Sequence, residues 1–201
     1  GLASHFVWTN RSKESLTLDG KHAEANTVLT RLLRDADVLV QNLAPGAAAR
    51  LGLSFAALHE SYPRLIVCDI SGYGDSGPYR DKKAYDLLIQ SESGFLSVTG
   101  TPDEPAKAGC SIADISAGMY AYSNILAALI QRGKTGKGSR VEVSMLETMA
   151  EWMSYPLYYA IDDAAPPQRS GAAHSTIYPY GPFTAGDGKV VMLGLQNERE
   201  W

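Results

Sequence analysis

Cysteine is scarce in this chain, which has only Cys68 and Cys110 among its 201 residues. Their spacing does not match a disulfide framework or a zinc knuckle, and the four histidines are scattered along the chain. We therefore expect no disulfide framework, no metal site, and a reducing, cytoplasmic location.

Long apolar runs and an excess of positive charge are also missing. No stretch approaches the roughly 18 to 20 apolar residues that a membrane helix needs, and the first residues lack the pattern of a secretion signal. The formal net charge is -4, with 18 Lys and Arg against 22 Asp and Glu. Nucleic-acid binding requires clustered cationic side chains. We expect no membrane segment and no nucleic-acid partner, so small molecules or other proteins remain as partners.

Neither end of the sequence has the features expected at the end of a complete protein. The chain opens with Gly1 instead of Met, and it stops at Trp201, where a polar helical pattern begins. We expect these residues to be part of a longer protein.

Helical and strand patterns alternate along the chain. Apolar residues at helical spacing predict a helix over residues 22–36, and a short apolar strand follows at 37–40. Ser54 is placed to cap a short helix that ends before Pro63, and a second strand follows at 65–70. Two such units in series predict a parallel, doubly wound α/β sheet. Ligands of such sheets bind beyond the carboxyl ends of the strands.

The second half of the chain continues this alternation. The patterns predict, in order, helices over 84–92 and 111–132, a strand over 140–144, a helix over 145–161 and a strand over 190–193. Gly133 is expected to end the second of these helices, whose apolar stripe comprises Ile115, Met119, Tyr122, Leu126 and Leu129. We place an α/β domain at 1–161, a linker at 162–176 and the start of a second, smaller domain at 177–201.

A glycine-rich segment follows the second predicted strand. Its sequence GYGDSG at residues 72–77 fits the pattern G-x-G-x-x-G of dinucleotide sites. Six further residues separate the glycines from the next predicted helix, whereas a dinucleotide site needs a helix to begin at once. We therefore interpret the segment as a substrate or gating loop. The segments expected at the ligand crevice are residues 41–46 and 71–78, which follow the first and second predicted strands. Four basic residues are compatible with a solvated surface, but two of them lie in or beside these segments, where they suit an anionic ligand: Arg50, Arg80, Lys82 and Lys83.

Asp114 lies where the long predicted helix begins. The sequence from Ser111 to Asp114 has the spacing of a capping box, so the carboxylate could simply close the first turn. The same position suits a nucleophile, because a helix N-terminus lowers the pKa of a carboxylate and keeps it ionised. The pattern alone leaves both interpretations open.

Several stretches, in one consistent order, resemble family III (CaiB/BaiF-type) coenzyme A transferases. The first contains DVLVQN at 37–42 with PG and RLG following it, and the second contains GYG, GPY and AYD between residues 72 and 86, then Gln90, SG and TG. The third begins at Asp114 and Gly118 and continues through TGKG at 135–138 and VEVS at 141–144. PYG and DG near the end extend the likeness over nearly the whole chain.

The resemblance implies a fold, a reaction and a set of site residues. The fold is the Rossmann-like parallel-sheet large domain of this family, present in part, with a linker toward a second domain. The reaction moves CoA between an acyl-CoA and a carboxylic acid, and Asp114, at the family's catalytic aspartate, carries the acyl and CoA groups covalently. The residues implied to contact CoA are Asn42, Leu43, Arg50, Lys83, Tyr85 and Met145.

Two alternatives remain beside the transferase. An α-methylacyl-CoA racemase of the same family would pair this aspartate with a histidine where the chain has Tyr85. A phenol with a pKa of about 10 is poorly matched to that proton transfer. A catalytically inactive CoA-binding subunit would bind CoA and be indifferent to Asp114→Asn.

The chain also departs from the family. It lacks the family's N-terminal segment and most of its C-terminal half, and the nearest candidate for a glycine-rich loop over the active site is SGAAH at 170–174.

Family members form interlocked homodimers, so we expect these residues to be poorly stable alone. A cooperative melt of the isolated chain as a monomer would contradict that expectation. The sequence does not determine the donor and acceptor acids.

Overall fold

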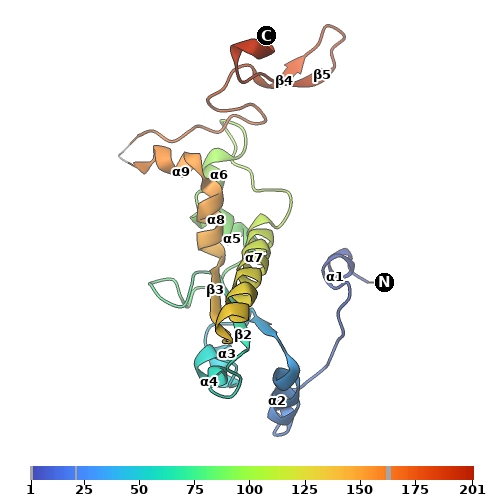
Figure 1. The fold of residues 1–201 in the computed structure, drawn as a ribbon. Helices are drawn as coiled ribbons and strands as arrows, with labels where there is room; N and C mark the ends of the chain where they lie inside the picture. The colour runs from blue at the N-terminus through green and yellow to red at the C-terminus, as the bar shows by residue number, and fades with distance from the viewer. Residues whose placement is uncertain (1, 21, 162–163) are drawn as a thin grey trace. The chain divides into compact units, whose positions relative to one another are not determined.

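The computed structural model describes residues 2–20, 22–161 and 164–201. The chain divides into two compact units, residues 1–36 and residues 37–201, and each is described by itself. The first unit contains α1 (Ser4–Thr9) and α2 (Ala25–Asp35) (Figure 1). The predicted helix over 22–36 is therefore confirmed, whereas α1 was not predicted. The proposed linker at 162–176 stays a prediction, and residues 162 and 163 lie outside the described residues.

A three-stranded parallel sheet is the centre of the second unit. It contains β1 (Val38–Gln41), β2 (Ile66–Ser71) and β3 (Arg140–Ser144), in the order β1-β2-β3. The predicted parallel α/β sheet is confirmed. Ile66, Val67 and Cys68 of the middle strand are all buried, because parallel strands of this kind are covered on both faces.

Helices follow each strand. Two short helices, α3 (Ala47–Arg50) and α4 (Phe55–His59), lie between β1 and β2, and the Ser54 hydroxyl caps α4 as predicted by accepting from the Ala57 amide. After β2 come α5 (Asp86–Glu92), α6 (Phe95–Val98) and the 24-residue α7 (Ile112–Thr135). After β3 come α8 (Met145–Met153) and α9 (Tyr155–Tyr159). None of the helices within the described ranges is long and apolar enough to cross a membrane.

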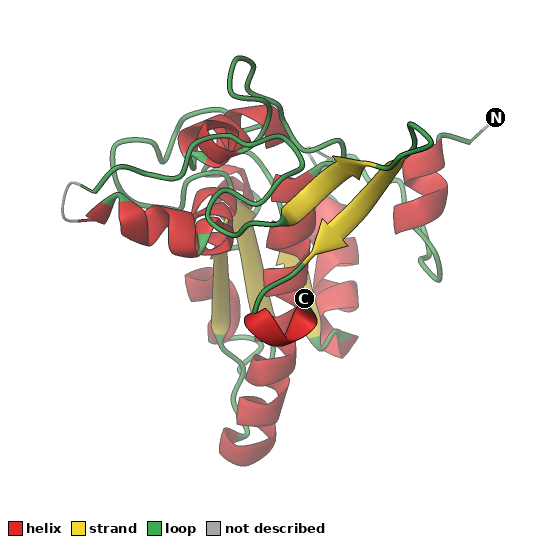
Figure 2. Ribbon diagram, turned by 90° about the horizontal axis from the view of Figure 1, so that it is seen from above, coloured by secondary structure: helices red, strands yellow, loops and turns green. Residues whose placement is uncertain are grey.

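The main core lies between the sheet and three helices. Side chains of β2 and β3, such as Ile66, Cys68 and Val143, pack with Ile89 of α5 and Met149 of α8. Helix α7 runs beside α8, and Figure 1 shows the two next to each other. Figure 2 shows helices around the strands of the sheet. The face that α7 buries is made of small residues, namely Ala113, Ser116, Ala117, Ala121 and Ala128. Small side chains allow the helix backbone to approach the sheet closely.

The structure corrects three details of the predicted helices. In the predicted apolar stripe of α7, Met119, Tyr122 and Leu126 are exposed, because the alanine face packs inward instead. Helix α7 continues through Gly133 and ends at Thr135, and the next residue, Gly136, has a φ of 74°, the left-handed conformation that glycine adopts without strain. The predicted helix over 145–161 is broken at Ser154, which has a φ of 48° and precedes Pro156 by two residues.

The C-terminal part forms a small hairpin. Strands β4 (Tyr180–Thr184) and β5 (Val190–Gly194) pair antiparallel, and a short 3-10 helix, η2 (Glu198–Glu200), follows. Strand β5 confirms the predicted strand at 190–193, but β4 was not predicted because Gly181 and Pro182 interrupt its apolar pattern. Upstream of the hairpin, the Arg169 guanidinium donates to the carbonyl oxygens of Thr101 and Pro102 at 2.9 Å each.

Candidate functional site

Asp114 is an exposed residue in the first turn of α7, although its carboxyl group is partly shielded from water. The residues around it in the helix, Ala113, Ser116 and Ala117, are buried against the core. The backbone that carries Asp114 is therefore fixed, while its side chain points away from the core. A rigid backbone with an accessible functional group is the arrangement that a nucleophile requires.

The capping-box interpretation of this turn is wrong. Ser111 is the residue before the helix, but its side chain makes no capping hydrogen bond. The cap comes from a different helix, because the Ala113 amide donates to Asp86 Oδ1 at 2.9 Å. Asp86 is the first residue of α5. Since a distant carboxylate satisfies this amide, the carboxylate of Asp114 is free of the capping role.

A buried amide side chain holds Asp86 in place. Gln90 is 0% exposed, and its Nε2 donates to Asp86 Oδ2 at 2.7 Å. Its Oε1 accepts from the Ala108 amide at 2.8 Å. Both ends of the amide are therefore used, as expected for a fully buried polar group. The network Ala108–Gln90–Asp86–Ala113 joins α5, the loop before α7 and the first turn of α7.

The pKa of the Asp114 carboxyl is raised above its ordinary value. Partial burial is the main cause, the negative charge of Asp86 adds to it, and the amide of Asp114 itself acts in the opposite direction. The expectation that the helix N-terminus would lower this pKa is therefore wrong. The first-turn amide is already engaged by Asp86, so a second negative charge faces Asp114 where free amides would otherwise stabilise the anion.

Three of the predicted CoA-contacting residues follow β1. Asn42 and Leu43 are exposed in the loop directly after the strand, and Arg50 is exposed at the end of α3. The Arg50 guanidinium lies beside Gly46, where a Cβ atom would stand 3.0 Å from Nη1. The loop after β1 therefore has the cationic side chain of Arg50 beside its backbone at Gly46.

Two adjacent lysines after the glycine-rich loop differ sharply. Lys82 forms an ion pair with Glu92, and its Nζ lies 4.2 Å from the centre of the Tyr79 ring and 5.5 Å from that of Tyr73. Lys83 is exposed, and it has no hydrogen-bond or ion-pair partner within the part of the chain that the structure describes. Lys82 fixes the loop, which leaves Lys83 as the lysine available to a ligand.

Tyr85 and Met145 occupy opposite environments. Tyr85 is 67% exposed and immediately precedes Asp86 at the start of α5. Met145 is only 7% exposed and belongs to the core cluster, so its side chain packs inside the molecule. Its neighbour Leu146 donates its amide to the Gly72 carbonyl at 3.0 Å, which attaches the start of α8 to the glycine-rich loop.

Direct contacts bring several of these segments together. Gly72 approaches Ala84 so closely that a Cβ atom would be 2.2 Å from the alanine Cβ, so the glycine-rich loop packs against the start of α5. The start of α5 in turn caps α7 through Asp86. Asp86 and Gln90 were known from the sequence only as part of the resemblance. Their spacing of four residues on one helix face was the signal that they act together.

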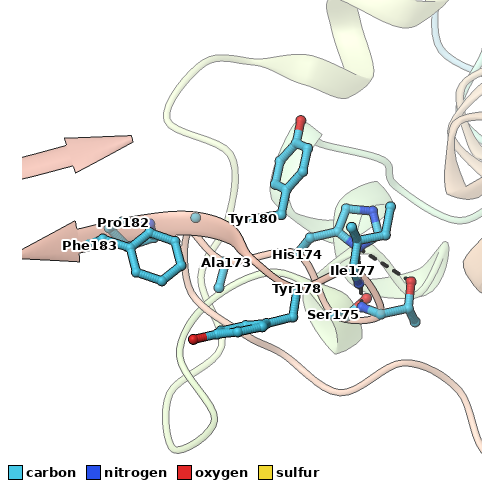
Figure 3. A pocket seen from close by; sticks show the side chains of 10 residues that line it. Ala173, His174, Ser175, Ile177, Tyr178, Tyr180, Pro182 and Phe183 are labelled. Atoms are coloured by element: carbon cyan, nitrogen blue, oxygen red, sulfur yellow. Dashed lines mark hydrogen bonds between the residues drawn. The ribbon is translucent and has the colours of Figure 1, made fainter. Parts of the chain in front are cut away.

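A separate hollow lies at the base of the β4–β5 hairpin. It has a volume of about 350 Å³ and is lined by residues 173–178 and 180–183, and none of the predicted site residues is among them. Figure 3 shows the rings of Tyr178 and Phe183 beside each other, with His174 elsewhere in the lining. His174 Nδ1 accepts from the amides of Thr176 and Ile177 at 3.1 Å each, so this ring shapes its own turn. The chemistry of Asp114, and not this hollow, defines the candidate site.

These features define an α/β protein with an exposed aspartate in the first turn of a helix that packs against a parallel sheet. Comparison with known proteins identifies the class: CoA-transferase family III matches residues 1–201, and the chain belongs to that family. The resemblance seen in the sequence is thereby confirmed.

Individual relatives of the chain are named CoA-transferases. Succinate--glutarate CoA-transferase of Agrobacterium fabrum is 37% identical over 191 residues, which is 94% of this chain and 48% of that protein. Formyl-CoA:oxalate CoA-transferase of Streptomyces avermitilis is 42% identical over 142 residues, covering 70% of this chain and 34% of that protein. The crystal structure of a CaiB/BaiF family protein from Brucella suis superposes with a TM-score of 0.80 at 36% identity, over 88% of this chain and 47% of that one. The chain thus spans about half the length of such relatives, or less.

Proposed function

We propose that the full-length protein transfers CoA between an acyl-CoA and a carboxylic acid, with Asp114 as the covalent carrier. The observation that carries this proposal is the exposed Asp114 carboxylate on a fixed helical turn whose capping role is taken by Asp86. Membership of CoA-transferase family III supports the same reaction. The cytoplasm, where acyl-CoA is available, is the proposed location.

The proposed reaction proceeds through two kinds of covalent intermediate. An Asp114 oxygen attacks the thioester carbonyl of the donor, the carbon–sulfur bond breaks, and a mixed anhydride and CoA thiolate result. The thiolate attacks the Asp114 carbonyl carbon, which releases the donor acid and leaves an aspartyl-CoA thioester. The acceptor carboxylate then attacks this thioester and expels the thiolate. Attack of the thiolate on the acceptor's carbonyl gives the new acyl-CoA and restores Asp114.

Cationic and polar groups around the site support CoA as the ligand. Arg50 and Lys83 are exposed cations that follow the loops after β1 and β2, respectively, and they suit the phosphate groups of CoA. Asn42 and Leu43 are exposed in the loop after β1, and Tyr85 is exposed at the start of α5. Met145 is also proposed to contact CoA. This proposal rests on its position in the family resemblance alone, because its side chain packs in the core.

The raised pKa of Asp114 fits the proposed role. A carboxylate with a higher pKa is a better nucleophile once it is ionised, since it stabilises its own charge less. The negative charge of Asp86 and partial burial both act in that direction. The resulting anhydride and thioester hydrolyse in water, so other parts of the full-length protein would have to cover Asp114 during turnover.

Short dicarboxylates are the proposed acids. One relative is named a succinate--glutarate CoA-transferase, and another is named a formyl-CoA:oxalate CoA-transferase. A screen of acceptors would therefore begin with these three acids.

A homodimer is the proposed assembly. Helix α7 exposes large apolar side chains at Met119, Tyr122, Leu126 and Ile130, which are from 43% to 66% exposed. Such a stripe is typical of a surface that another chain segment or subunit covers.

Hydroxylamine trapping tests the covalent mechanism. The full-length protein is incubated with an acyl-CoA, quenched with hydroxylamine and digested, and modified peptides are found by mass spectrometry. We expect a hydroxamate on Asp114. Glu147 is a matched internal control, because it is an exposed acid in the first turn of α8 and should remain unmodified.

An unmodified Asp114 at saturating acyl-CoA would overturn the covalent mechanism. Exchange of the acyl α-proton with deuterium from solvent would then indicate a racemase. CoA binding without either reaction would indicate an inactive binding subunit.

A further inference from the structure

A row of polar side chains crosses the sheet on the face opposite the main core. Gln41 of β1 lies next to Asp69 of β2 in the strand register, and Asp69 lies next to Glu142 of β3. Gln41 Nε2 donates to Asp69 Oδ1 at 2.9 Å. Each strand of the sheet thus contributes one polar residue to the row.

Arg140 connects this row to the glycine loop, defined here as residues 72–78. Its Nε donates to Asp69 Oδ2 at 2.7 Å, and its Nη1 donates to Asp75 Oδ2 at 3.0 Å. The same Nη1 lies 3.3 Å from Glu142 Oε2. The guanidinium therefore bonds to the middle strand and to the tip of the loop at once, a geometry that a lysine could not reproduce.

The other end of the row connects to the first crevice loop, defined here as residues 42–46. The Leu43 amide donates to Gln41 Oε1 at 2.9 Å, so the amide group of Gln41 bonds to both the loop and Asp69. Within the glycine loop, the Gly74 amide donates to Ser71 Oγ at 3.0 Å. An unbroken relay, Leu43–Gln41–Asp69–Arg140–Asp75, thereby joins the two loops.

The charged residues of the relay do not suit direct contact with CoA. The relay contains two carboxylates, Asp69 and Asp75, and one guanidinium, and the carboxylate of Glu142 lies beside Arg140, so the local charge is negative and would repel phosphate groups. Asp69 is only 14% exposed in its side chain and Arg140 is 36% exposed, so the bond between them is partly shielded from water. Surface ion pairs alone stabilise proteins by about 1 kcal/mol or less, which makes stability a weak reason for such a network.

We propose that Asp69 and Arg140 are positioning residues that set the placement of the first crevice loop relative to the glycine loop. This inference rests on the proposed function, because both loops border the proposed CoA site. Asp69 and Arg140 act through Leu43 on one side and Asp75 on the other, and neither Asp69 nor Arg140 touches the ligand. Without the relay, the two loops are no longer held in one fixed arrangement relative to each other when CoA binds.

The test compares Arg140→Gln with Arg132→Gln in the full-length protein. Arg132 is the matched control, because its guanidinium also bonds to a carboxylate, that of Asp37 at 2.8 Å, but near the amino end of the sheet. Two quantities are measured: the Kd of coenzyme A by titration calorimetry, and hydrogen–deuterium exchange of residues 42–46 and 71–79. Asp75→Asn, at a half-exposed loop position, provides a second variant that leaves the strands intact.

The relay predicts that Arg140→Gln speeds exchange in both loops, including the first crevice loop, which Arg140 does not touch. It also predicts a rise in the Kd of about threefold to thirtyfold, with little change in kcat, while Arg132→Gln leaves both unchanged. Effects of Arg140→Gln and Asp75→Asn should not add in the double variant.

Faster exchange confined to the glycine loop, or additive effects on the Kd, would overturn the relay. If the wild-type protein does not bind coenzyme A, the proposed function fails, but the exchange measurement still decides whether the two loops are coupled.

Discussion

The two ends of α7 are built in different ways. At the C-terminal end, Arg132 is 11% exposed in its side chain and donates to Asp37 Oδ1 and to the carbonyl oxygens of Asp37 and Arg64. At the N-terminal end, the Asp114 carboxylate is exposed, and the residue that caps the helix carries a second negative charge. One end therefore stabilises the sheet with a cation close to the helix C-terminus, as the helix dipole favours. The other end keeps an anion at an energetic disadvantage, which is typical of a functional position.

The largest expected difference between the two ends concerns catalysis. Asp114→Asn should lower CoA transfer at least about 10³-fold, because the amide cannot form the anhydride. Arg132→Gln should leave the turnover of correctly folded protein unchanged. Steady-state rates with succinyl-CoA and glutarate would check both. Transfer by Asp114→Asn at the wild-type rate would remove Asp114 from the mechanism.

The same substitution should not reduce stability. The pKa of Asp114 is higher in the folded protein than in an ordinary aspartate, so folding disfavours its anion. The ionised carboxylate therefore lowers stability at neutral pH, and this penalty fades as the pH falls through the raised pKa. Asp114→Asn removes the charge, and we expect an equal or higher melting temperature at pH 7. A lower melting temperature would mean that the anion stabilises the helix after all.

Stability should depend on both ends to a similar degree. Gln90→Leu leaves the Ala108 amide and one oxygen of Asp86 without their partner, and Arg132→Gln weakens bonds to two carbonyl groups and Asp37. Each should lower the free energy of unfolding by about 1 to 3 kcal/mol. Urea denaturation measures the loss. Only Gln90→Leu should also slow CoA transfer, because it releases Asp86 and with it the turn that carries Asp114.

The sequence was informative about the strands and less so about this helix end. Short apolar runs predicted β1 and β2, and the alternation of apolar and polar residues predicted β3, because strands that pack against a core show one of these two patterns. The cap of α7 could not be read locally, since Asp86 lies 27 residues before Ala113 and only the fold brings them together. The local pattern from Ser111 to Asp114 favoured a capping box that does not form.

Two other misjudgements have physical causes as well. Large apolar residues on α7 predicted the buried face, but close packing against the sheet selects alanine instead. Two glycines stand near the end of α7, and the sequence does not show which of them takes a positive φ. At the site, Lys83 was named from the resemblance, while the engagement of Lys82 by Glu92 and Tyr79 depends on the folded loop.

The comparison extends to pH. Asp114 must be ionised to attack, so the rate of hydroxamate formation should fall as the pH drops through its raised pKa. Asp86→Asn removes the neighbouring negative charge, so the acid limb of the profile should move to lower pH. The pKa of Asp114 should stay partly raised, because its burial does not change. Asp103→Asn, in an exposed loop, is the control and should leave the profile in place. An acid limb that does not move in Asp86→Asn would show that Asp86 does not tune Asp114.

The smallest effect concerns two glycines, one near each end of α7. A Cβ atom at Gly118 or at Gly133 would meet nothing within 4 Å in the described part of the chain. Alanine favours a helix over glycine by about 0.5 to 1 kcal/mol, so Gly118→Ala and Gly133→Ala should each raise stability by that amount. Gly118, however, lies one turn after Asp114 on the same helix face, where a methyl group would narrow the space beside the carboxylate. We expect Gly118→Ala alone to raise the KM for acyl-CoA several-fold, and equal kinetics in the two variants would mean that the ligand does not approach Asp114 along this face.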